Sequence, residues 1–256
     1  GYETLEKPEW TQTAAAGQRH RAEIPMQTDK MPSEGVQISV TDLTMGYGDV
    51  ILMRDLHFTV NRGDVFAIMG GSGCGKSTLL RILVGLKAPQ NGKVTYGQTD
   101  FWSLREVDRK HMMRNLGVMY QNGALWSSMT LAENVGLPLR LHTDCSAEEI
   151  REMVRFKLSL VGLSGFEAHF PSQLSGGMRQ RAGLARALAL DPEILFFDEP
   201  SAGLDPVSAK QLDDLILEIN RSLGATIILV THELASIFAI ASNAIYLDAA
   251  THTAGG

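Results

Sequence analysis

The hydrophobic and polar positions of this chain follow two different periods. Strands are predicted where short apolar or alternating runs occur, at 36–43, 57–64, 64–70, 88–97, 116–120, 193–199, 225–232 and 243–249. The segments 206–223 and 233–242, which separate the last of these strands, have the apolar spacing of helices. Because strands that alternate with helices form parallel sheets, the pattern predicts an α/β fold.

The strand pattern largely disappears between residues 122 and 190. Within this region the segment 146–163 repeats its apolar residues at helical spacing, on a face formed by Ile150, Met153, Val154, Leu158 and Val161. Ser146 and Glu149 have the spacing of an N-terminal capping box. We therefore expect a mostly helical insertion over about 122–190, inside a domain that runs from 36 to 256.

The strand at 64–70 runs directly into a glycine-rich loop and a helix. The loop fits the pattern G-x-x-x-x-G-K-[ST], with the residues Gly70, Gly71, Ser72, Gly73, Cys74, Gly75, Lys76, Ser77 and Thr78. Glycines let backbone N–H groups converge on phosphate, and the helix directs its positive N-terminus to the same point. The apolar stripe expected on this helix is Leu79, Leu80, Leu83 and Leu86. The pattern predicts that Lys76 reaches the β- and γ-phosphates and that Ser77 binds Mg²⁺.

Two adjacent carboxylates follow the buried strand pattern ILFF. A carboxylate at the carboxyl end of a parallel strand can lie beside the metal of a phosphate site, which is the role we expect for Asp198. Glu199 would then polarise an attacking water as a general base. By themselves, adjacent acids at a strand end are also typical of a solvated turn.

Composition restricts the possible functions of the chain less than these motifs do. The net charge is −6, which argues weakly against a general affinity for nucleic acid. No run reaches the roughly 18 apolar residues of a membrane-spanning helix, and the two cysteines imply no disulfide framework. Residues 1–35 are polar, with three prolines and no apolar segment of the signal-peptide kind, and we expect a flexible extension there.

Further motifs, taken with the phosphate loop, closely resemble those of ABC ATPases. The stretch LSGGM at 174–178 resembles their signature, with its two glycines at the mouth of a helix. The other elements follow in family order: Tyr47 before the loop, Gln121 after the strand at 116–120, SAGLD at 201–205, and His232 after IILVT. This resemblance runs from about residue 36 to 249. It implies a RecA-like core of the P-loop NTPase class with an N-terminal antiparallel β part and an inserted helical subdomain.

The resemblance also implies roles for individual residues. Tyr47 would stack on adenine, Gln121 would contact Mg²⁺ and the attacking water, and His232 would hold the γ-phosphate. Residues of the signature, Ser175, Gly176 and Gly177, would contact ATP bound to a second copy of the chain, and Asp205 would link the two sites. The metal ligands implied are Ser77, Gln121 and Asp198, and the catalytic residues are Glu199, His232, Gln121 and Lys76.

The segment after Gln121 resembles the Mla/Mce-type ATPases in particular. The residues that carry this resemblance are GAL at 123–125, an aromatic at 126, SSMT at 127–130, PLRLHT at 138–143 and Met178. It implies phospholipid traffic in double-membraned bacteria, with a permease subunit at the cytoplasmic face of the inner membrane. An Mce-domain protein and a small regulatory subunit are further partners it suggests. Alternatives are an importer ATPase for another solute such as an amino acid, or a soluble ABC protein of nucleic-acid or translation function.

Several residues have two interpretations. Cys74 could serve redox control or simply be a small side chain in the loop. Leu125 could belong to a socket for a partner helix, with Trp126 and Met129, or to the helical core. Arg179 and Arg181 could mimic a nucleic-acid stripe, but arginines on an acidic chain more often face solvent or phosphate. After 249 the chain reads ATHTAGG, where family members commonly continue with another strand and helices.

Overall fold

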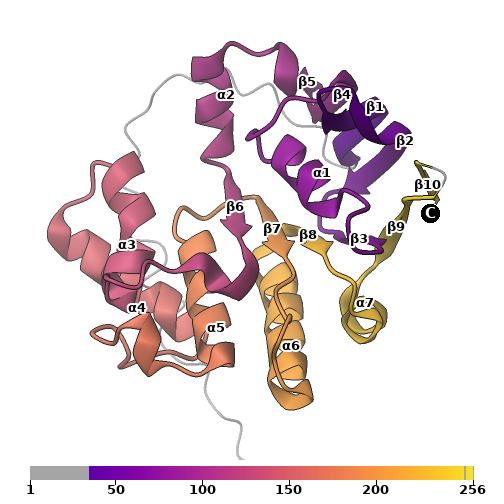
Figure 1. Cartoon of the computed structure of the whole chain (residues 1–256). Helices are drawn as coiled ribbons and strands as arrows, with labels where there is room; N and C mark the ends of the chain where they lie inside the picture. Colours follow the sequence, from indigo (N-terminus) through magenta and orange to yellow (C-terminus); the bar gives the residue numbers. More distant parts are fainter. Residues whose placement is uncertain (1–34, 251, 256) are drawn as a thin grey trace, which may run out of the picture. The chain divides into compact units, whose positions relative to one another are not determined.

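The computed structural model describes residues 35–250 and 252–255. Apart from Gly35, the extension expected at 1–35 lies outside the described residues. The strands are β1 (Val36–Tyr47), β2 (Val50–Asn61), β3 (Val65–Gly70), β4 (Asn91–Tyr96), β5 (Thr99–Asp100), β6 (Leu116–Met119), β7 (Ile194–Asp198), β8 (Thr226–Val230), β9 (Asn243–Asp248) and β10 (Thr253–Gly255). The helices are α1 (Lys76–Leu83), α2 (Glu106–Met113), α3 (Leu131–His142), α4 (Ala147–Leu160), α5 (Gly176–Ala187), α6 (Pro206–Leu223) and α7 (Leu234–Ile240) (Figure 1).

The strands form two sheets. One has four strands in the order β2-β1-β4-β5, and its strands pair antiparallel. The other has six strands in the order β10-β9-β3-β8-β7-β6, all parallel except for β10 at one edge. The predicted α/β core and its N-terminal antiparallel part are therefore confirmed.

The six-stranded sheet separates two hydrophobic cores. Successive side chains of a strand point to opposite faces, so Ile194 and Phe196 of β7 pack with α1 and the antiparallel sheet. Leu195 and Phe197 pack on the other face, against the helices of the 131–190 region and α6. Helix α1, which follows the glycine-rich loop, is thus buried between the two sheets.

The region 121–190 contains helices and turns. Its elements are α3, α4 and α5, with short 3₁₀ turns at Gln121–Ala124 and Pro171–Gln173, and no strand lies among these residues, all of which the structure describes. The expected capping box at Ser146 and Glu149 forms at the start of α4. Helix α3 begins with a second capping box, formed by Thr130 and Glu133. The helical insertion is thus present, to the side of the sheet in Figure 1.

Two local expectations need correction, and one strand was not predicted. Leu86 does not continue the apolar stripe of α1, because the helix ends at Leu83 and Gly85 takes φ +84° and turns the chain. Leu86 is consequently 59% exposed. The second strand begins at Val50 rather than at residue 57, since its pairing with β1 continues to the tight turn after Tyr47. The C-terminal β10, which has no hydrophobic pattern, forms by pairing with β9.

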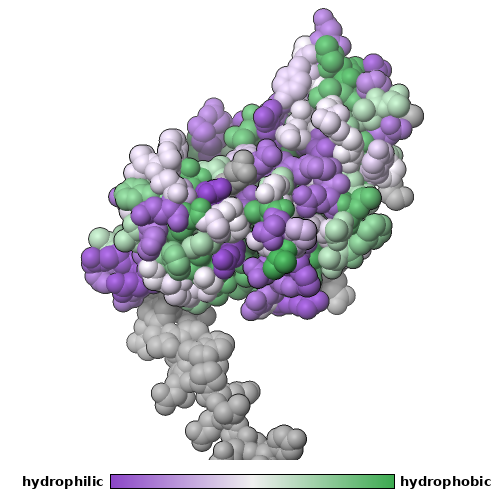
Figure 2. All heavy atoms as spheres, turned by 60° about the horizontal axis from the view of Figure 1, so that its bottom comes forward, coloured by the Kyte–Doolittle hydropathy of each residue, from purple (hydrophilic) through white to green (hydrophobic). Residues whose placement is uncertain are grey.

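Among the residues that the structure describes, every helix is too short or too polar to cross a bilayer. In the view of Figure 2, apolar residues lie as separate spots among polar ones.

Candidate functional site

The glycine-rich loop connects β3 to α1, as its sequence predicts. Gly70 takes φ +152°, and a Cβ atom at this position would lie 2.5 Å from Cys74 Sγ and 2.7 Å from the carbonyl oxygen of Leu247. Gly75 precedes α1 with φ +102°, a conformation that L side chains rarely adopt. Both positions therefore require glycine. The Cys74 side chain is buried beneath the loop, in keeping with its interpretation as a small packing residue.

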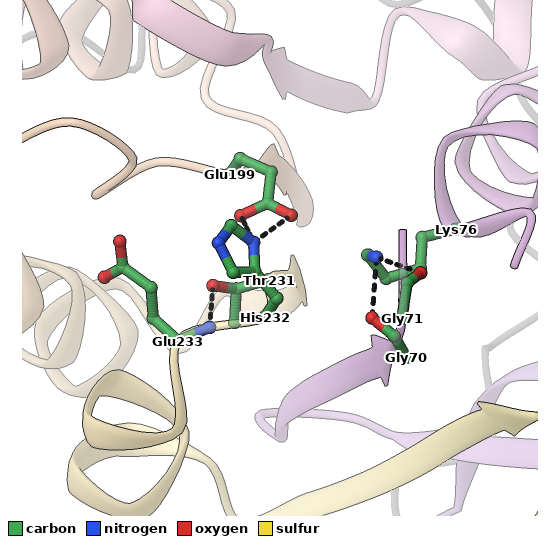
Figure 3. A network of polar contacts seen from close by, with 7 residues as sticks. All are labelled: Gly70, Gly71, Lys76, Glu199, Thr231, His232 and Glu233. Carbon is green, nitrogen blue, oxygen red and sulfur yellow. Dashed lines mark hydrogen bonds and ion pairs between the residues drawn. The ribbon is translucent and has the colours of Figure 1, made fainter. Parts of the chain in front are cut away.

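Lys76 is the first residue of α1, and its side chain folds back over the loop. Its Nζ donates hydrogen bonds to the carbonyl oxygens of Gly70 (2.8 Å) and Gly71 (3.1 Å), as Figure 3 shows. No carboxylate pairs with this ammonium among the ion pairs of the described residues. Its positive charge is held above the loop by neutral acceptors and remains available to an anion.

The two adjacent acids lie at the carboxyl end of β7, next to β8 in the sheet. Asp198 Oδ1 is buried and has no hydrogen-bond partner within the described part of the chain. Burial raises the pKa of the Asp198 carboxyl, and the neighbouring Glu199 raises it further, while Arg81 and Lys76 oppose the shift. Glu199 takes φ +50°, which is uncommon for a residue other than glycine. Its N–H donates to the carbonyl oxygen of Val230 (2.8 Å), and this bond helps to hold the turn.

His232 follows β8 and faces Glu199. Its Nδ1 lies 2.9 Å from Glu199 Oε1 and 2.8 Å from Oε2. Figure 3 shows the carboxylate beside the imidazole, across from Lys76. The loop behind the histidine is held by Thr231, whose Oγ1 accepts a hydrogen bond from the N–H of Glu233 (3.0 Å). The structure thus brings the expected base and the expected γ-phosphate ligand into direct contact.

A cleft of about 700 Å³ joins the glycine-rich loop to Glu199 and His232, whereas Asp198 does not line it. It is lined by Leu52, Gly70, Gly71, Ser72, Gly73, Gly75, Lys76, Ser77, Thr78, Gln121, Glu199 and His232. All of these residues except Leu52 were expected to line a site from the sequence. Leu52 belongs to β2 and lines the cleft because the antiparallel sheet packs on the loop. No local sequence pattern predicts this position.

Tyr47 lies at the end of β1, and its ring is half exposed. Its hydroxyl shares a hydrogen bond with Thr78 Oγ1 (3.3 Å) and accepts one from Arg81 Nη1 (3.1 Å). These bonds lower the pKa of the Tyr47 hydroxyl. Lys87 Nζ lies 4.5 Å from the centroid of the ring. The aromatic side chain is therefore attached to α1, the helix that carries the phosphate loop.

The signature residues lie elsewhere and do not line this cleft. Ser175 caps α5, and its Oγ accepts a hydrogen bond from the N–H of Met178 (3.2 Å). A Cβ atom on Gly177 would lie 3.4 Å from the side chain of Ser208, so the starts of α5 and α6 are neighbours. Asp205 caps α6 and accepts hydrogen bonds from Val207 N and Ser208 N, both at 3.0 Å.

The segment after Gln121 exposes one of its three large apolar side chains. Trp126 is 59% exposed, whereas Leu125 is partly buried and packs on the core of the helical region. Met129 is also partly buried. Leu125 therefore packs on the core, and Trp126 is the exposed apolar side chain of this segment.

Sequence reasoning missed two groups of supporting residues. Arg81 and Lys87, which hold Tyr47, were not singled out, although Arg81 follows Thr78 by three residues on a helix and shares its face. Asn134 and Arg186 were also missed. Arg186 Nη2 donates to the Gly123 carbonyl oxygen (3.0 Å), and Asn134 binds the segment 126–130.

The residues present fit a nucleoside triphosphate with a divalent cation. Nothing lies within 4 Å of the position a Cβ would take on Gly71 or Gly73, so the loop is open to a ligand that approaches its backbone. Lys76 supplies a positive charge, and the buried Asp198 Oδ1 supplies an oxygen without a partner in the described chain. Oxygen ligands of this kind suit Mg²⁺.

A strand, glycine loop and helix that face two carboxylates on a nearby parallel strand define the P-loop class of nucleotide-binding proteins. Residues 53–202 match the model of the ABC transporter family, and the chain belongs to this family. The resemblance read from the motifs is thereby confirmed.

Named relatives and solved structures agree with this assignment. The probable ribonucleotide transport ATP-binding protein mkl of Mycobacterium tuberculosis is 45% identical over 200 residues, which cover 78% of this chain and 56% of that protein. The chain thus spans little more than half the length of mkl. The intermembrane phospholipid transport system ATP-binding protein MlaF of Haemophilus influenzae is 40% identical over 207 residues, covering 81% of this chain and 78% of that protein.

Among solved structures, one similar to this chain is the ATP-binding cassette MJ0796, a dimer in a post-hydrolysis state bound to ADP and Pi. Its TM-score is 0.77 at 30% sequence identity, and the match covers 86% of this chain and 97% of that chain. The cbiO1 protein of Clostridium perfringens, part of an ABC transporter complex, has a TM-score of 0.79 and 25% identity, covering 86% and 87%.

Proposed function

We propose that this chain is the ATP-hydrolysing subunit of a bacterial ABC transporter. The observation that carries the proposal is the cleft in which Lys76 and the glycine loop face Glu199 and His232. A positive charge and converging N–H groups on one side suit a phosphate chain, and a carboxylate on the other side suits activation of water. Tyr47, at the end of β1, supports a nucleotide as the ligand because its half-exposed ring can stack on a base.

Each residue of the cleft would have a defined task. Lys76 Nζ would exchange its two carbonyl acceptors for phosphate oxygens, and the loop N–H groups would bind the remaining charge. Glu199 would accept the proton of the attacking water, and His232, within hydrogen-bond distance of that carboxylate, would orient it. Ser77, Gln121 and Asp198 would hold Mg²⁺, which when bound neutralises charge that develops on the phosphate oxygens.

A second copy of the chain would complete each site. Ser175, Gly176, Gly177 and Asp205 lie together at the starts of α5 and α6 and do not line the cleft of their own chain. In a dimer closed over two ATP molecules, these residues would contact the nucleotide held by the other copy. The dimeric state of the related cassette bound to ADP and Pi supports this arrangement.

A permease at the cytoplasmic face of the inner membrane would receive the closing motion, with the segment 123–130 and its exposed Trp126 as the contact. We propose phospholipid as the transported substrate, because the motifs in and after this segment resemble Mla/Mce-type ATPases and MlaF relatives cover most of the chain. An Mce-domain protein and a small regulatory subunit would complete the system. The name of mkl makes a ribonucleotide the second candidate substrate.

Glu199→Gln tests the catalytic proposal. The amide cannot accept a proton, so ATP should still bind while turnover falls by about 100-fold or more. The ATP-bound variant should also accumulate as a dimer in size-exclusion chromatography. Lys76→Ala is the matched control and should lose both ATP binding and turnover. Near-normal hydrolysis by Glu199→Gln would remove Glu199 from its role.

Isolation of the complex from bacterial membranes tests the transport proposal. The tagged chain should co-purify with a polytopic permease, and lipid extraction of the purified complex should yield bound phospholipid. Trp126→Ala should reduce permease recovery without changing ATP binding. A complex that binds ribonucleotide at its membrane subunit, or co-purification with nucleic acid or ribosomes, would contradict phospholipid transport.

A further inference from the structure

The side chain of Tyr47 is half exposed, and yet several polar contacts fix its orientation. Its hydroxyl accepts a hydrogen bond from Arg81 Nη1 (3.1 Å) and shares one with Thr78 Oγ1 (3.3 Å). An exposed ring at the tip of a hairpin ordinarily samples several rotamers, and ordering it on binding costs free energy. With the hydroxyl attached at two points, the ring is already oriented before a ligand arrives.

One face of the ring is occupied by a cation. Lys87 Nζ lies 4.5 Å from the ring centroid, within the range of a cation–π contact. A base cannot stack on the face of the ring that the Lys87 ammonium already occupies. A base must therefore approach Tyr47 from the opposite face, and Lys87 limits the ring to one stacking surface.

The hairpin that carries Tyr47 is held from the same part of the chain. Gln90 Nε2 donates to the Gly48 carbonyl oxygen (2.6 Å), and the Gln90 N–H donates to the Thr44 carbonyl oxygen (2.9 Å). Thus Gln90 contacts the β1–β2 hairpin on both sides of Tyr47.

All of these contacts originate from α1 or the loop that connects it to β4. Thr78 and Arg81 belong to α1, and Lys87 follows its end, where its N–H donates to the Arg81 carbonyl oxygen (3.1 Å). The same helix begins with Lys76, which closes the phosphate loop. A single buried helix therefore connects the phosphate-binding residues to the aromatic ring and sets their separation.

We propose that Arg81 is a positioning residue for the nucleotide base. It holds the Tyr47 ring through its hydroxyl, at a fixed orientation relative to the phosphate loop, and Lys87 restricts stacking to the free face. This inference rests on the proposed function, because it requires Tyr47 to stack on the base of a bound nucleotide. It adds that the hydroxyl of Tyr47, as well as its ring, contributes to affinity.

A double-mutant cycle tests the contact between Arg81 and Tyr47. Tyr47→Phe keeps the stacking ring and loses the hydroxyl, and Arg81→Met keeps the stem and loses the donor. Binding of ADP should weaken by about three- to tenfold in each single variant, as expected for one hydrogen bond at a partly exposed site. The double variant should bind no more weakly than the weaker single variant, because both changes break the same contact.

Pyrophosphate is the matched probe, since it occupies the phosphate loop and has no base. Its binding, measured by competition, should stay within about twofold of wild type in all three variants. A general loosening of α1 would weaken both ligands, and loss of base positioning weakens ADP alone. Arg62→Met, which removes an exposed arginine paired with Glu193 away from the cleft, should leave ADP binding unchanged.

The outcomes separate the inference from the proposed function. If wild type binds neither ADP nor pyrophosphate, or Lys76→Ala binds both as well as wild type does, the nucleotide site itself is wrong. If wild type binds ADP and Tyr47→Phe binds it equally well, or the two single effects add in full, Arg81 does not position the base through Tyr47. Unchanged melting temperatures of the exposed-site variants confirm that each comparison involves folded protein.

Discussion

Asn134 and Asp198 each place polar atoms in the interior, but only Asn134 finds hydrogen-bond partners for them; the Asp198 side chain is partly buried, and its Oδ1 is the atom that is shielded from solvent. Asn134 is fully buried, and its amide donates to the carbonyl oxygens of Trp126 (3.1 Å), Met129 (3.1 Å) and Thr130 (3.0 Å). Its Oδ1 accepts a hydrogen bond from the Trp126 N–H (2.8 Å). Asp198 Oδ1 is buried without a partner in the described chain. An unpaired buried oxygen costs free energy, which a ligand can recover.

The surroundings of the two residues show the same contrast. Beside Asp198, Glu199 takes an uncommon backbone conformation and Lys76 has only carbonyl partners, so this region keeps strained and incompletely paired groups. Around Asn134, Arg186 adds a long contact to Oδ1 (3.5 Å) and a hydrogen bond to Gly123. Asn134 and Arg186 thus use their polar groups to hold the segment after Gln121, whereas Asp198 Oδ1 and Lys76 Nζ remain available to a ligand.

The largest expected effect is on catalysis, from Asp198→Asn. We expect ATP turnover to fall by about 100-fold or more, because a charged ligand of the metal site is worth several kcal/mol in the transition state. The fall should appear in steady-state hydrolysis with Mg²⁺. Turnover within tenfold of wild type would show that the unpaired oxygen of Asp198 is not part of the site.

The same variant should be more stable than wild type in buffer without metal or nucleotide. Burial and Glu199 raise the pKa of Asp198 in the folded chain, so folded protein holds more protons between the unfolded and folded pKa values. The free energy of unfolding therefore falls as pH rises through that window. Asparagine cannot ionise, and the melting temperature of the variant should exceed that of wild type at neutral pH, with the difference vanishing in acid.

Asn134→Ala should have the reverse profile. The change leaves carbonyl oxygens of Trp126, Met129 and Thr130 without their buried donor, and we expect a loss of about 2–4 kcal/mol in the free energy of unfolding. Denaturant titration measures this loss. Binding of ADP to the phosphate loop should change by less than about twofold, since Asn134 does not line the cleft. A stability unchanged by the substitution would contradict the structural role of Asn134.

The cleft could be predicted from the sequence more fully than its supports. Local patterns specify the residues of the phosphate loop, Asp198 and Glu199. The end of a parallel strand and the loop that follows it lie at the carboxyl edge of the sheet, so the position of these residues follows from the strand pattern. His232 required the resemblance to a family. Arg81 and Lys87 reach Tyr47 only because the β1–β2 hairpin packs on α1, and this long-range contact has no local signature.

The same limit explains the error at Leu86 and two features that the sequence left open. Leu86 matched the helical period, but the period cannot show where Gly85 turns the chain. The difference in exposure between Leu125 and Trp126 depends on Asn134, which lies several residues further along and fixes the loop. Strand β10 is held by backbone pairing with β9, which polar residues satisfy as well as apolar ones.

The smallest expected effect concerns an ion pair that joins the helical region to the turn before β7. Lys157 of α4, whose side chain is 3% exposed, pairs with Asp191, whose side chain is 68% exposed. Asp191→Asn keeps a residue type that tolerates the φ of +51° at this position and removes only the charge. The buried ammonium then lacks its counter-ion, and we expect a loss of about 1–2 kcal/mol in the free energy of unfolding, less than for an ion pair buried at both ends.

Lys157→Met is the matched control, because it removes the buried charge together with the need for a partner and should cost less than Asp191→Asn. Both variants should hydrolyse ATP at the wild-type rate, since neither residue lines the cleft. If Lys157→Met were the more destabilising of the two, the loss in Asp191→Asn would not come from an unpaired buried ammonium. A Lys157→Met variant less stable than wild type would show that the attraction between the charges outweighs the cost of burying the ammonium. This pair would then stabilise the helical region through its charge, as Asn134 does through its neutral hydrogen bonds.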